Sequence, residues 1–441
     1  MNDFQKTAKE MLDFITKSPT CFHAVANIGT MLEAAGYEKL QENEEWKLEK
    51  GGKYYTERND SSVIAFAIPA GTVKGFHMAA AHSDSPSFKV KEKPELAVEE
   101  HYLRLNTEKY GGMILSTWLD RPLSVAGRLA VRGEFGIESR LVNIDRDLCV
   151  IPNVAIHMNR EMNKGVEYNP QVDMLPLFAD ATCDTDAAGG VETTDGSQEK
   201  TTLLGLAAEA AGMDEEAILG EDLFLYTRQE GGFLGARGEF VLSPRLDDLQ
   251  SAFALTKAFT ESAPAEYINI CGIFDNEEVG SGTRQGADST FLTDALDRIT
   301  EGLGADHGTY LRWIADGFLI SADNAHAVHP NHPEKADPTN RPYLNGGIVI
   351  KFHGSQKYTT DGISAAKMKE YCERAKVPYQ TYANRSDIAG GSTLGNISTA
   401  HVSVSSVDIG LPQLAMHSAV ETAGMMDTEY AVRALREFWS E

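Results

Sequence analysis

The sequence has few cysteines and no long apolar run. Five cysteines occur among 441 residues, and none is spaced as CxxC, which argues against a disulfide framework and against a cysteine zinc site. No window approaches the roughly 18 uninterrupted apolar residues of a spanning helix, and the N-terminus has no basic stretch followed by an apolar core. We therefore expect no membrane span and no signal peptide, and a location in the reducing cytoplasm.

Basic residues are scarce relative to acidic ones. Lys and Arg together number 40 against 65 for Asp and Glu, so the formal net charge is −25. A field of this sign repels phosphates, and we therefore expect neither nucleic acid nor an anionic membrane surface as a partner. Hydrophobic residues make up 42% of the chain, which is enough to form the cores of two domains.

The pattern of apolar residues predicts an α/β domain. Two helical patterns open the chain, the first with its apolar face between residues 4 and 15 and the second closing at Gly36. Strands are predicted at 63–68, 74–81, 267–274, 317–321 and 347–352, and helices at 249–260, 363–375 and 428–441. Alternating strands and helices favour a mixed, largely parallel central sheet.

The middle of the chain has a different pattern of apolar residues. From about residue 92 to 235, short β-like runs such as 123–131 and 141–144 alternate with turns, and the polar stretch 181–200 predicts a loop. We therefore assign residues 1–92 and 236–441 to one catalytic α/β domain, which is interrupted by a β-rich domain at 93–235.

Side chains typical of metal ligands follow several predicted strands. Singly, each segment is a weak signal, because a lone histidine is more often structural and an Asp-Asp pair can simply cap a helix beginning near Leu249. An open α/β sheet, however, gathers the carboxyl ends of its strands along one edge. The segments are His82-Ser83-Asp84, Arg245-Leu246-Asp247-Asp248, Glu277-Glu278, Asp323-Asn324-Ala325-His326 and Met416-His417-Ser418.

Nitrogen and oxygen donors without thiolates point to zinc, with manganese or cobalt as substitutes. Two such ions, roughly 3.5–4 Å apart and sharing a carboxylate and a water, are a known device for hydrolysis. The doubled Glu277-Glu278 suits this chemistry, since one acid can ligate a metal while the other moves a proton from the water to the leaving amine. His82 and Asp84 can likewise divide ligation and ring orientation.

Several ordered motifs resemble the M18 aminopeptidases. They are SPTCFHAV at 18–25, AHSDSP at 81–86, SPRLDD at 243–248, FDNEEVGS at 274–281 and AHAVHPN at 325–331, with TWLDRPLSVAGR at 117–128 and IPNVAIH at 151–157 in the insertion. The similarity runs from about residue 18 to the C-terminus. So many motifs in the same order make a chance agreement implausible.

The resemblance implies a dinuclear zinc exopeptidase, with roles assigned by position. His82 and Asp323 would bind one ion, Glu278 and His417 the other, Asp247 would bridge them, Glu277 would be the general base, and Asp84 would orient His82. His326 would polarise the scissile carbonyl or stabilise its oxyanion, unless it is an ordinary loop histidine. Related dimetal peptidases carry a cis peptide bond at the position of Asp247-Asp248.

The resemblance assigns roles to two further residues, and each of these roles has an alternative. Family members bring a histidine of the insertion into the active site of a neighbouring subunit; His157 occupies that motif and is expected to contact substrate, the alternative being zinc ligation. Lys351 matches the position thought to meet an acidic substrate side chain, the alternative being a surface lysine. The family also implies dimers that assemble into a tetrahedral dodecamer.

We therefore expect a metallo-aminopeptidase (EC 3.4.11.-) that removes one N-terminal residue, acidic in preference, from peptides. A first alternative is the same dimetal site with neutral or broad specificity. A second, from another class, is a catalytically silent peptide-binding or assembly protein of the same fold, which the presence of every proposed ligand and of the base disfavours.

Overall fold

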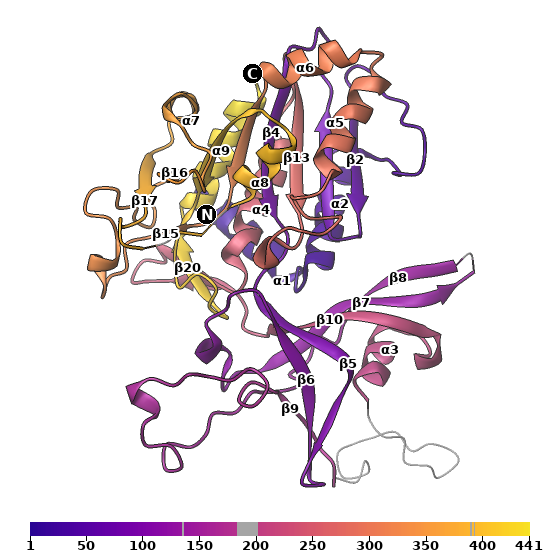
Figure 1. Cartoon of the computed structure of the whole chain (residues 1–441), viewed down its shortest axis with the longest axis vertical. Coiled ribbons are helices and arrows are strands. Elements are labelled where there is room, and N and C mark those ends of the chain that lie inside the picture. The colour runs from indigo at the N-terminus through magenta and orange to yellow at the C-terminus, as the bar shows by residue number, and fades with distance from the viewer. Residues whose placement is uncertain (135, 183–201, 389, 392) are drawn as a thin grey trace. The chain divides into compact units, whose positions relative to one another are not determined.

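The computed structural model describes residues 1–134, 136–182, 202–388, 390–391 and 393–441. Within them the chain forms two compact units, Met1–Ser85 with Glu230–Glu441, and Pro86–Gln229 (Figure 1). The sequence-based boundaries, after residues 92 and 235, stay predictions. The loop predicted at 181–200 lies outside the described residues from 183 onward.

The first unit is built on a nine-stranded mixed sheet, as the sequence predicts. In spatial order the strands are β1 (Glu38–Lys39), β2 (Lys53–Arg58), β3 (Ser62–Ala67), β13 (Tyr267–Phe274), β4 (Gly75–His82), β14 (Phe318–Ala322), β18 (Ser405–Gly410), β16 (Ile348–Phe352) and β17 (Tyr379–Ala383). The four central strands, β13 to β18, run parallel, whereas β3 and β16 are antiparallel to their inner neighbours.

Helices cover both faces of this sheet (Figure 1). On β4, Ala79 and Ala81 pack into one apolar core, and Phe76 and Met78 into the other, because successive side chains of a strand point to opposite faces. The first core includes side chains of five helices: α1 (Asp3–Thr16), α2 (Cys21–Ala34), α4 (Leu246–Thr260), α7 (Gly362–Ala375) and α9 (Asp427–Trp439). The second core includes side chains of α5 (Phe291–Gly302), α6 (His307–Ala315) and α8 (Leu394–His401). Burial on both faces explains the uninterrupted apolar runs of the central strands.

A smaller five-stranded sheet belongs to the same unit. Its order is β11 (Gly232–Leu234), β12 (Phe240–Ser243), β20 (Glu421–Gly424), β19 (Pro412–Leu414) and β15 (Ala325–His326). Strand β12 leads directly into α4, and the turn between β19 and β20 contains His417. This sheet therefore brings two ligand-bearing segments beside each other.

The second unit is β-rich, in agreement with the prediction. Six antiparallel strands lie in the order β8 (Gly136–Asn143), β7 (Leu123–Gly133), β10 (Ile218–Thr227), β5 (Ser87–Val98), β6 (Tyr102–Tyr110) and β9 (Leu177–Asp180), accompanied by α3 (Leu203–Ala211). Strand β8 begins earlier than the predicted run 141–144, because its first part is exposed and polar and has no apolar signal.

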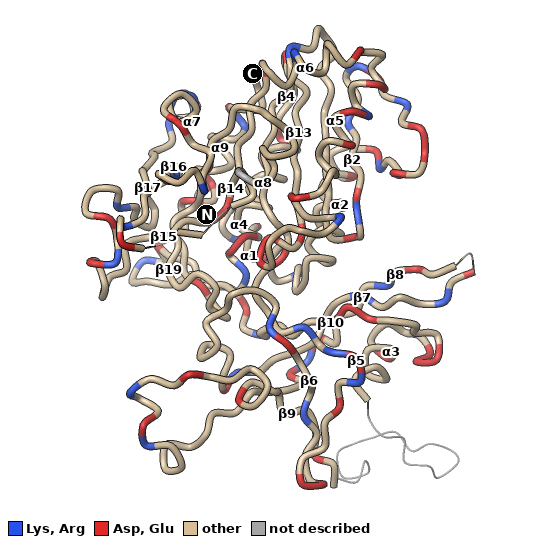
Figure 2. Tube along the Cα trace, viewed as in Figure 1, with Lys and Arg blue, Asp and Glu red and all other residues tan. Residues whose placement is uncertain are grey.

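Charged residues of both signs occur in both units. Figure 2 shows acidic residues interspersed with basic ones along the chain in both units. Among the described residues, no helix combines the length and the apolarity that a membrane span requires.

Candidate metal centre

The predicted ligands of the first unit converge at the carboxyl edge of its central sheet. His82 ends β4, Asp323 follows β14, and Glu277 and Glu278 form a 3₁₀ turn (Glu277–Val279) just after β13. Three groups of ligand atoms lie within 4.8 Å of one another: His82 with Asp248 and Asp323, His82 with Glu277 and Glu278, and Asp247 with Glu278 and His417. Parallel strands thus deliver these side chains to one place.

Asp247 lies between the two histidines. Its Oδ1 is 3.4 Å from Nε2 of His82, and its Oδ2 is 3.3 Å from Nε2 of His417. His417 Nε2 is also 3.4 Å from Oε1 of Glu278, while His82 Nε2 is 4.0 Å from Oδ1 of Asp323. Each oxygen of Asp247 therefore faces a different imidazole.

The Asp247-Asp248 pair is not a simple helix cap. Helix α4 begins at Leu246 instead of near Leu249, its N-cap is Arg245, and both aspartates lie inside its first turn with non-helical backbone angles. The peptide bond between them is cis, as the resemblance implies. The carboxylates of both aspartates lie among the other potential ligand atoms.

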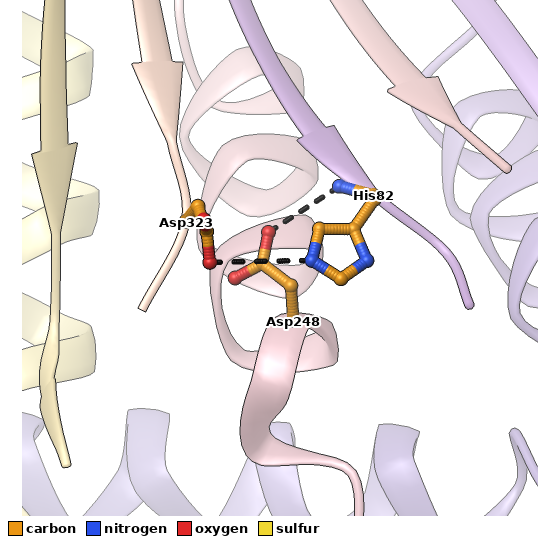
Figure 3. Close-up of side chains that lie close together, drawn as sticks. All are labelled: His82, Asp248 and Asp323. Carbon is orange, nitrogen blue, oxygen red and sulfur yellow. Dashed lines mark hydrogen bonds and ion pairs between the residues drawn. The ribbon is translucent and has the colours of Figure 1, made fainter. Parts of the chain in front are cut away.

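Asp248 stands in one of the candidate ligand segments, but the sequence reasoning assigned it no role. Its Oδ2 accepts the backbone N–H of His82 at 3.3 Å, and Figure 3 shows its carboxylate beside both His82 and Asp323. The doubled aspartate at the start of α4 was the available signal. The sequence does not show that the second aspartate contacts the backbone of His82, because that contact joins two segments far apart in the chain.

Asp84 contacts both His82 and the 3₁₀ turn that carries Glu277 and Glu278, which we call the glutamate turn. Its Oδ1 is 3.3 Å from Nδ1 of His82 and accepts the N–H of Glu277 at 3.1 Å. Its Oδ2 accepts the N–H of Glu278 at 3.2 Å. The backbone carbonyl of Asp84 also lies 3.1 Å from Nδ1 of His82, so this residue orients the imidazole with its carbonyl and carboxylate together, while the carboxylate fixes the turn that follows β13.

The charges of the site strongly perturb its carboxyl groups. Burial raises the pKa of Glu277 to about 7, and the nearby Asp323 carboxylate adds to this effect. Burial, followed by the charge of Asp247, also holds the pKa of Glu278 well above its ordinary range. Burial likewise raises the pKa of Asp323, although the Lys351 cation opposes the shift. Without a bound cation, the site therefore carries more buried negative charge than its surroundings stabilise.

The imidazole of His82 is affected in the opposite way, because the nearby carboxylates favour its charged form. Burial alone lowers the pKa of His82, but the carboxylates of Asp247 and Asp84 outweigh it and raise that pKa well above its usual value. Burial also acts to raise the pKa of Asp247, yet His417 and His82 hold it far below its ordinary range. Asp247 is therefore the carboxylate that the two imidazoles keep ionised.

These residues fit a pair of divalent cations. Asp247 Oδ1, Asp248 Oδ1 and Glu278 Oε1 are buried, and within the described part of the chain no hydrogen-bond donor satisfies them. Buried acceptors of this kind are costly unless they are compensated. Imidazole nitrogens and carboxylate oxygens without thiolates are a donor set that zinc accepts.

Lys351 is a buried residue of the site. Its side chain is only 2% exposed, and its Nζ lies 3.5 Å from Oδ2 of Asp323 and 5.5 Å from the ring centre of Tyr358. The alternative of a surface lysine is therefore wrong. Although burial lowers the pKa of Lys351, the charge of Asp323 more than offsets this and holds the pKa above its ordinary value.

His326 lines a cavity of about 320 Å³ together with His329, Lys335 and Gln413. Desolvation by the surrounding protein, followed by the charge of Lys351, lowers the pKa of His326. The imidazole is therefore held neutral near pH 7, a state in which it can donate one hydrogen bond without carrying charge.

Glu421 was also missed by the sequence reasoning. Its carboxylate accepts the backbone N–H groups of Asp247, at 3.0 Å, and of His417, at 2.7 Å. Burial, followed by the charge of Asp247, raises its pKa to about 8. The signal in the sequence was an acid four residues after His417, at the start of a short strand.

His157 belongs to the second unit, and its expected contact with substrate stays a prediction. It is exposed, in a segment whose start is held by Asp120: Oδ1 accepts the N–H of Asn153 at 2.9 Å, and Oδ2 accepts from its side-chain amide at 2.6 Å. Val154, Ile156 and Met158 are exposed around it. The segment thus presents apolar side chains and an imidazole to its surroundings.

Comparison with known sequences places the chain in a family. Residues 14–439 match the family described as "Aminopeptidase I zinc metalloprotease (M18)". A probable M18 family aminopeptidase 2 of Clostridium novyi (strain NT) is 46% identical over 439 residues, which cover 99% of each chain. A protein of the same description from Clostridium acetobutylicum is 46% identical over 437 residues, or 98% of each chain.

Solved structures agree with these sequence matches. A chain in the cryo-EM structure of the Ape4 and Nbr1 complex superposes with a TM-score of 0.93 at 36% identity, covering 99% of this chain and 86% of that one. The mApe1 dodecamer of S. cerevisiae gives a TM-score of 0.84 at 26% identity, covering 100% and 98%. The chain therefore belongs to the M18 family and is a zinc aminopeptidase.

Proposed function

We propose that this protein binds two zinc ions per chain and removes single N-terminal residues, with a preference for Asp or Glu, from peptides. The observation that supports the dinuclear site best is the position of Asp247, whose two oxygens face the Nε2 atoms of His82 and His417 at 3.4 and 3.3 Å. A carboxylate in that position can bridge two ions. Bound zinc supplies Lewis-acid polarisation of the scissile carbonyl and acidifies water.

The ligand assignment is the one that the family resemblance implies, and the close grouping of these side chains supports it. His82 and Asp323 would hold one ion, Glu278 and His417 the other, and Asp247 would belong to both. Asp248 contacts the backbone of His82 and is assigned a positioning role. Asp84, which faces Nδ1 of His82, would leave its Nε2 directed at the metal.

Glu277 is proposed as the general base. It is adjacent to the ligand Glu278, and Asp84 fixes its backbone, so its carboxylate is held beside the metal site. A carboxylate in this position can accept a proton from the attacking water and return it to the leaving amine nitrogen. Neutral His326 would donate a hydrogen bond to the carbonyl oxygen as it becomes negative.

Lys351 supports the proposed acidic preference. It is a buried cation at the edge of the site, and a substrate carboxylate that reached it would form a charge-assisted hydrogen bond with little competition from water. Asp323 already shares this cation, at 3.5 Å. For that reason a neutral or broad preference is retained as the second candidate.

Assembly is proposed by analogy with relatives. One similar structure is described as a dodecamer, and we propose that this chain forms dimers that assemble into a tetrahedral dodecamer in the cytoplasm. In that assembly His157 of one subunit would contact the substrate of another, with zinc ligation as the alternative. The exposed apolar side chains beside His157 suit burial in such an interface.

Two measurements test this proposal. Metal analysis of the purified protein should give two zinc ions per chain, and one ion or none contradicts the dinuclear site. Hydrolysis of Asp-, Glu- and Leu-anilides, with zinc, manganese or cobalt added in turn, should favour the acidic substrates. A faster reaction with the Leu substrate would establish the neutral or broad alternative.

A further inference from the structure

A buried carboxylate outside the proposed ligand set joins two of the segments that carry ligands. Glu421 is 2% exposed; its Oε2 accepts the N–H of Asp247 at 3.0 Å, and its Oε1 accepts the N–H of His417 at 2.7 Å. We propose that Glu421 is a positioning residue that sets the separation of these two ligands and thereby the affinity for zinc. This inference rests on the proposed ligand roles of Asp247 and His417.

The strand pairing explains why Glu421 reaches both segments. In the five-stranded sheet, Glu421 is paired with Ser243, the last residue of β12, and β12 runs directly into the turn that carries Asp247. Glu421 is also the first residue of β20, immediately after the β19–β20 turn that contains His417. One side chain at this junction therefore contacts both turns.

Both amide donors lie in irregular backbone. Asp247 is in the first turn of α4, where N–H groups have no partner within the helix, and it follows Arg245, which has a φ of 55°. His417 itself has a φ of 64°. Left-handed conformations are uncommon for residues other than glycine, so an external acceptor is needed to hold such turns in place.

The position of these backbones controls the geometry of the site. The carboxylate of Asp247 lies 3.4 Å from His82 and 3.3 Å from His417, and zinc requires ligand distances of about 2.0–2.2 Å with a defined geometry. A change in the separation of the two turns would move the shared ligand relative to both imidazoles. Losing the Glu421 bridge should therefore weaken zinc binding while every ligand is retained.

The test compares zinc affinity in metal-stripped wild type and Glu421→Gln, by competition with a chromophoric chelator. The amide has nearly the same size as the carboxylate but only one acceptor oxygen, so its NH₂ group would meet one of the two N–H donors. We expect zinc affinity to fall roughly 10- to 100-fold, as when other partners of metal ligands are changed. At saturating zinc, kcat for a peptide anilide should be lower and KM unchanged.

Asp427 provides a matched control. It too is fully buried, and its oxygens accept two backbone N–H groups, of Asn345 at 2.7 Å and of Gly347 at 2.9 Å. Asp427→Asn therefore removes a bridge of the same kind away from the ligands, and it should lower thermal stability while retaining wild-type zinc affinity. Equal losses of zinc affinity in both variants, or wild-type affinity in Glu421→Gln, would overturn the proposal.

Hydrogen exchange in the wild-type protein tests the same inference without a variant. If Glu421 holds the amides of Asp247 and His417, both should exchange slowly even after zinc is removed. Rapid exchange of both amides in the metal-free protein would show that the metal, and not Glu421, orders the two turns. Failure of the dinuclear proposal is distinguishable, because it appears as a wild-type zinc content below two per chain.

Discussion

The carboxylate of Asp84 accepts the backbone N–H of Glu277 at 3.1 Å. The same carboxylate lies 3.3 Å from His82 Nδ1, so the proposed base and a proposed metal ligand are held by one side chain. A displacement of Asp84 would therefore disturb proton transfer and ligation together. This coupling distinguishes Asp84 from residues that touch only one part of the site.

Replacing Asp84 should lower kcat more than it raises KM. Asp84→Asn retains the size of the side chain but loses an acceptor oxygen, so one N–H of the glutamate turn loses its partner, while the backbone carbonyl of Asp84 still faces Nδ1 of His82 at 3.1 Å. We expect kcat to fall by about 10- to 100-fold, with weaker zinc binding. Asp306→Asn is the control, because Asp306 also accepts a backbone N–H, from Thr309 at 2.7 Å, in the exposed first turn of α6. Steady-state kinetics that change alike in both variants would contradict the role of Asp84.

Replacing each of the two adjacent glutamates should give different results. Glu277→Gln should retain zinc and lower kcat by about 10²- to 10⁴-fold, since proton transfer loses its base. Glu278→Gln should instead lower zinc affinity by more than about 100-fold, since a ligand is lost. Zinc content and kcat, measured together, check both statements. Undiminished turnover in Glu277→Gln would refute the choice of base.

Mixing two inactive variants can show whether His157 acts in a neighbouring subunit. His157→Ala has an intact base, and Glu277→Gln has an intact His157, so a mixed dimer would contain one complete site if the histidine crosses between subunits. Coexpression in equal amounts should restore roughly a quarter of wild-type turnover per chain. Activity no greater than that of the separate variants would mean that His157 acts within its own chain or not at all.

Removing the buried lysine should reduce the preference for acidic substrates. A charge-assisted hydrogen bond contributes about 1.5–3 kcal/mol, so Lys351→Met should lower the ratio of kcat/KM for Asp- over Leu-anilide by about 10- to 100-fold. Lys357→Met is the control, because Lys357 is exposed and donates to the carbonyl of Gly390 at 2.9 Å. If the ratio is unchanged in Lys351→Met, another residue recognises the substrate side chain.

Stability should depend on pH through Asp427. Burial raises the pKa of Asp427 from an ordinary 3.8 to about 7, so ionisation is harder in the folded than in the unfolded protein. The stability that this group contributes is full below pH 3.8 and is lost as pH rises towards 7, by at most about 4 kcal/mol. The thermal midpoint of wild type minus that of Asp427→Asn should therefore be larger at pH 4.5 than at pH 8. A constant difference would contradict the raised pKa.

Much of the fold follows from local sequence patterns. Strand β13 was predicted with its observed bounds, Tyr267–Phe274, because an apolar run between polar turns fully specifies a strand that is buried on both faces. The predicted start of α4, near Leu249, was wrong, and the helix begins at Leu246. Helical periodicity does not distinguish a capping aspartate from one that lies in a non-helical first turn. The exposed first half of β8 was not predicted as a strand, because its residues give no periodic apolar signal.

The predicted ligands were recognisable as acids and histidines after strands, but the residues that hold them were not. Asp248 bonds the backbone of His82 across 166 positions of sequence, and Glu421 bonds that of Asp247 across 174. Such contacts depend on how strands cross in space, and no local pattern encodes them. The missed residues are accordingly those whose function lies in tertiary contacts.

The proposed ligands are distributed from His82 to His417, and this spread governs when the enzyme can first become active. A ribosome that adds about 5–20 residues per second needs roughly 20–70 s to pass from the first of these histidines to the second. During that time the nascent chain lacks one side of the centre. The peptidase therefore stays inactive at least until His417 has been added, 335 residues after His82 (417 − 82).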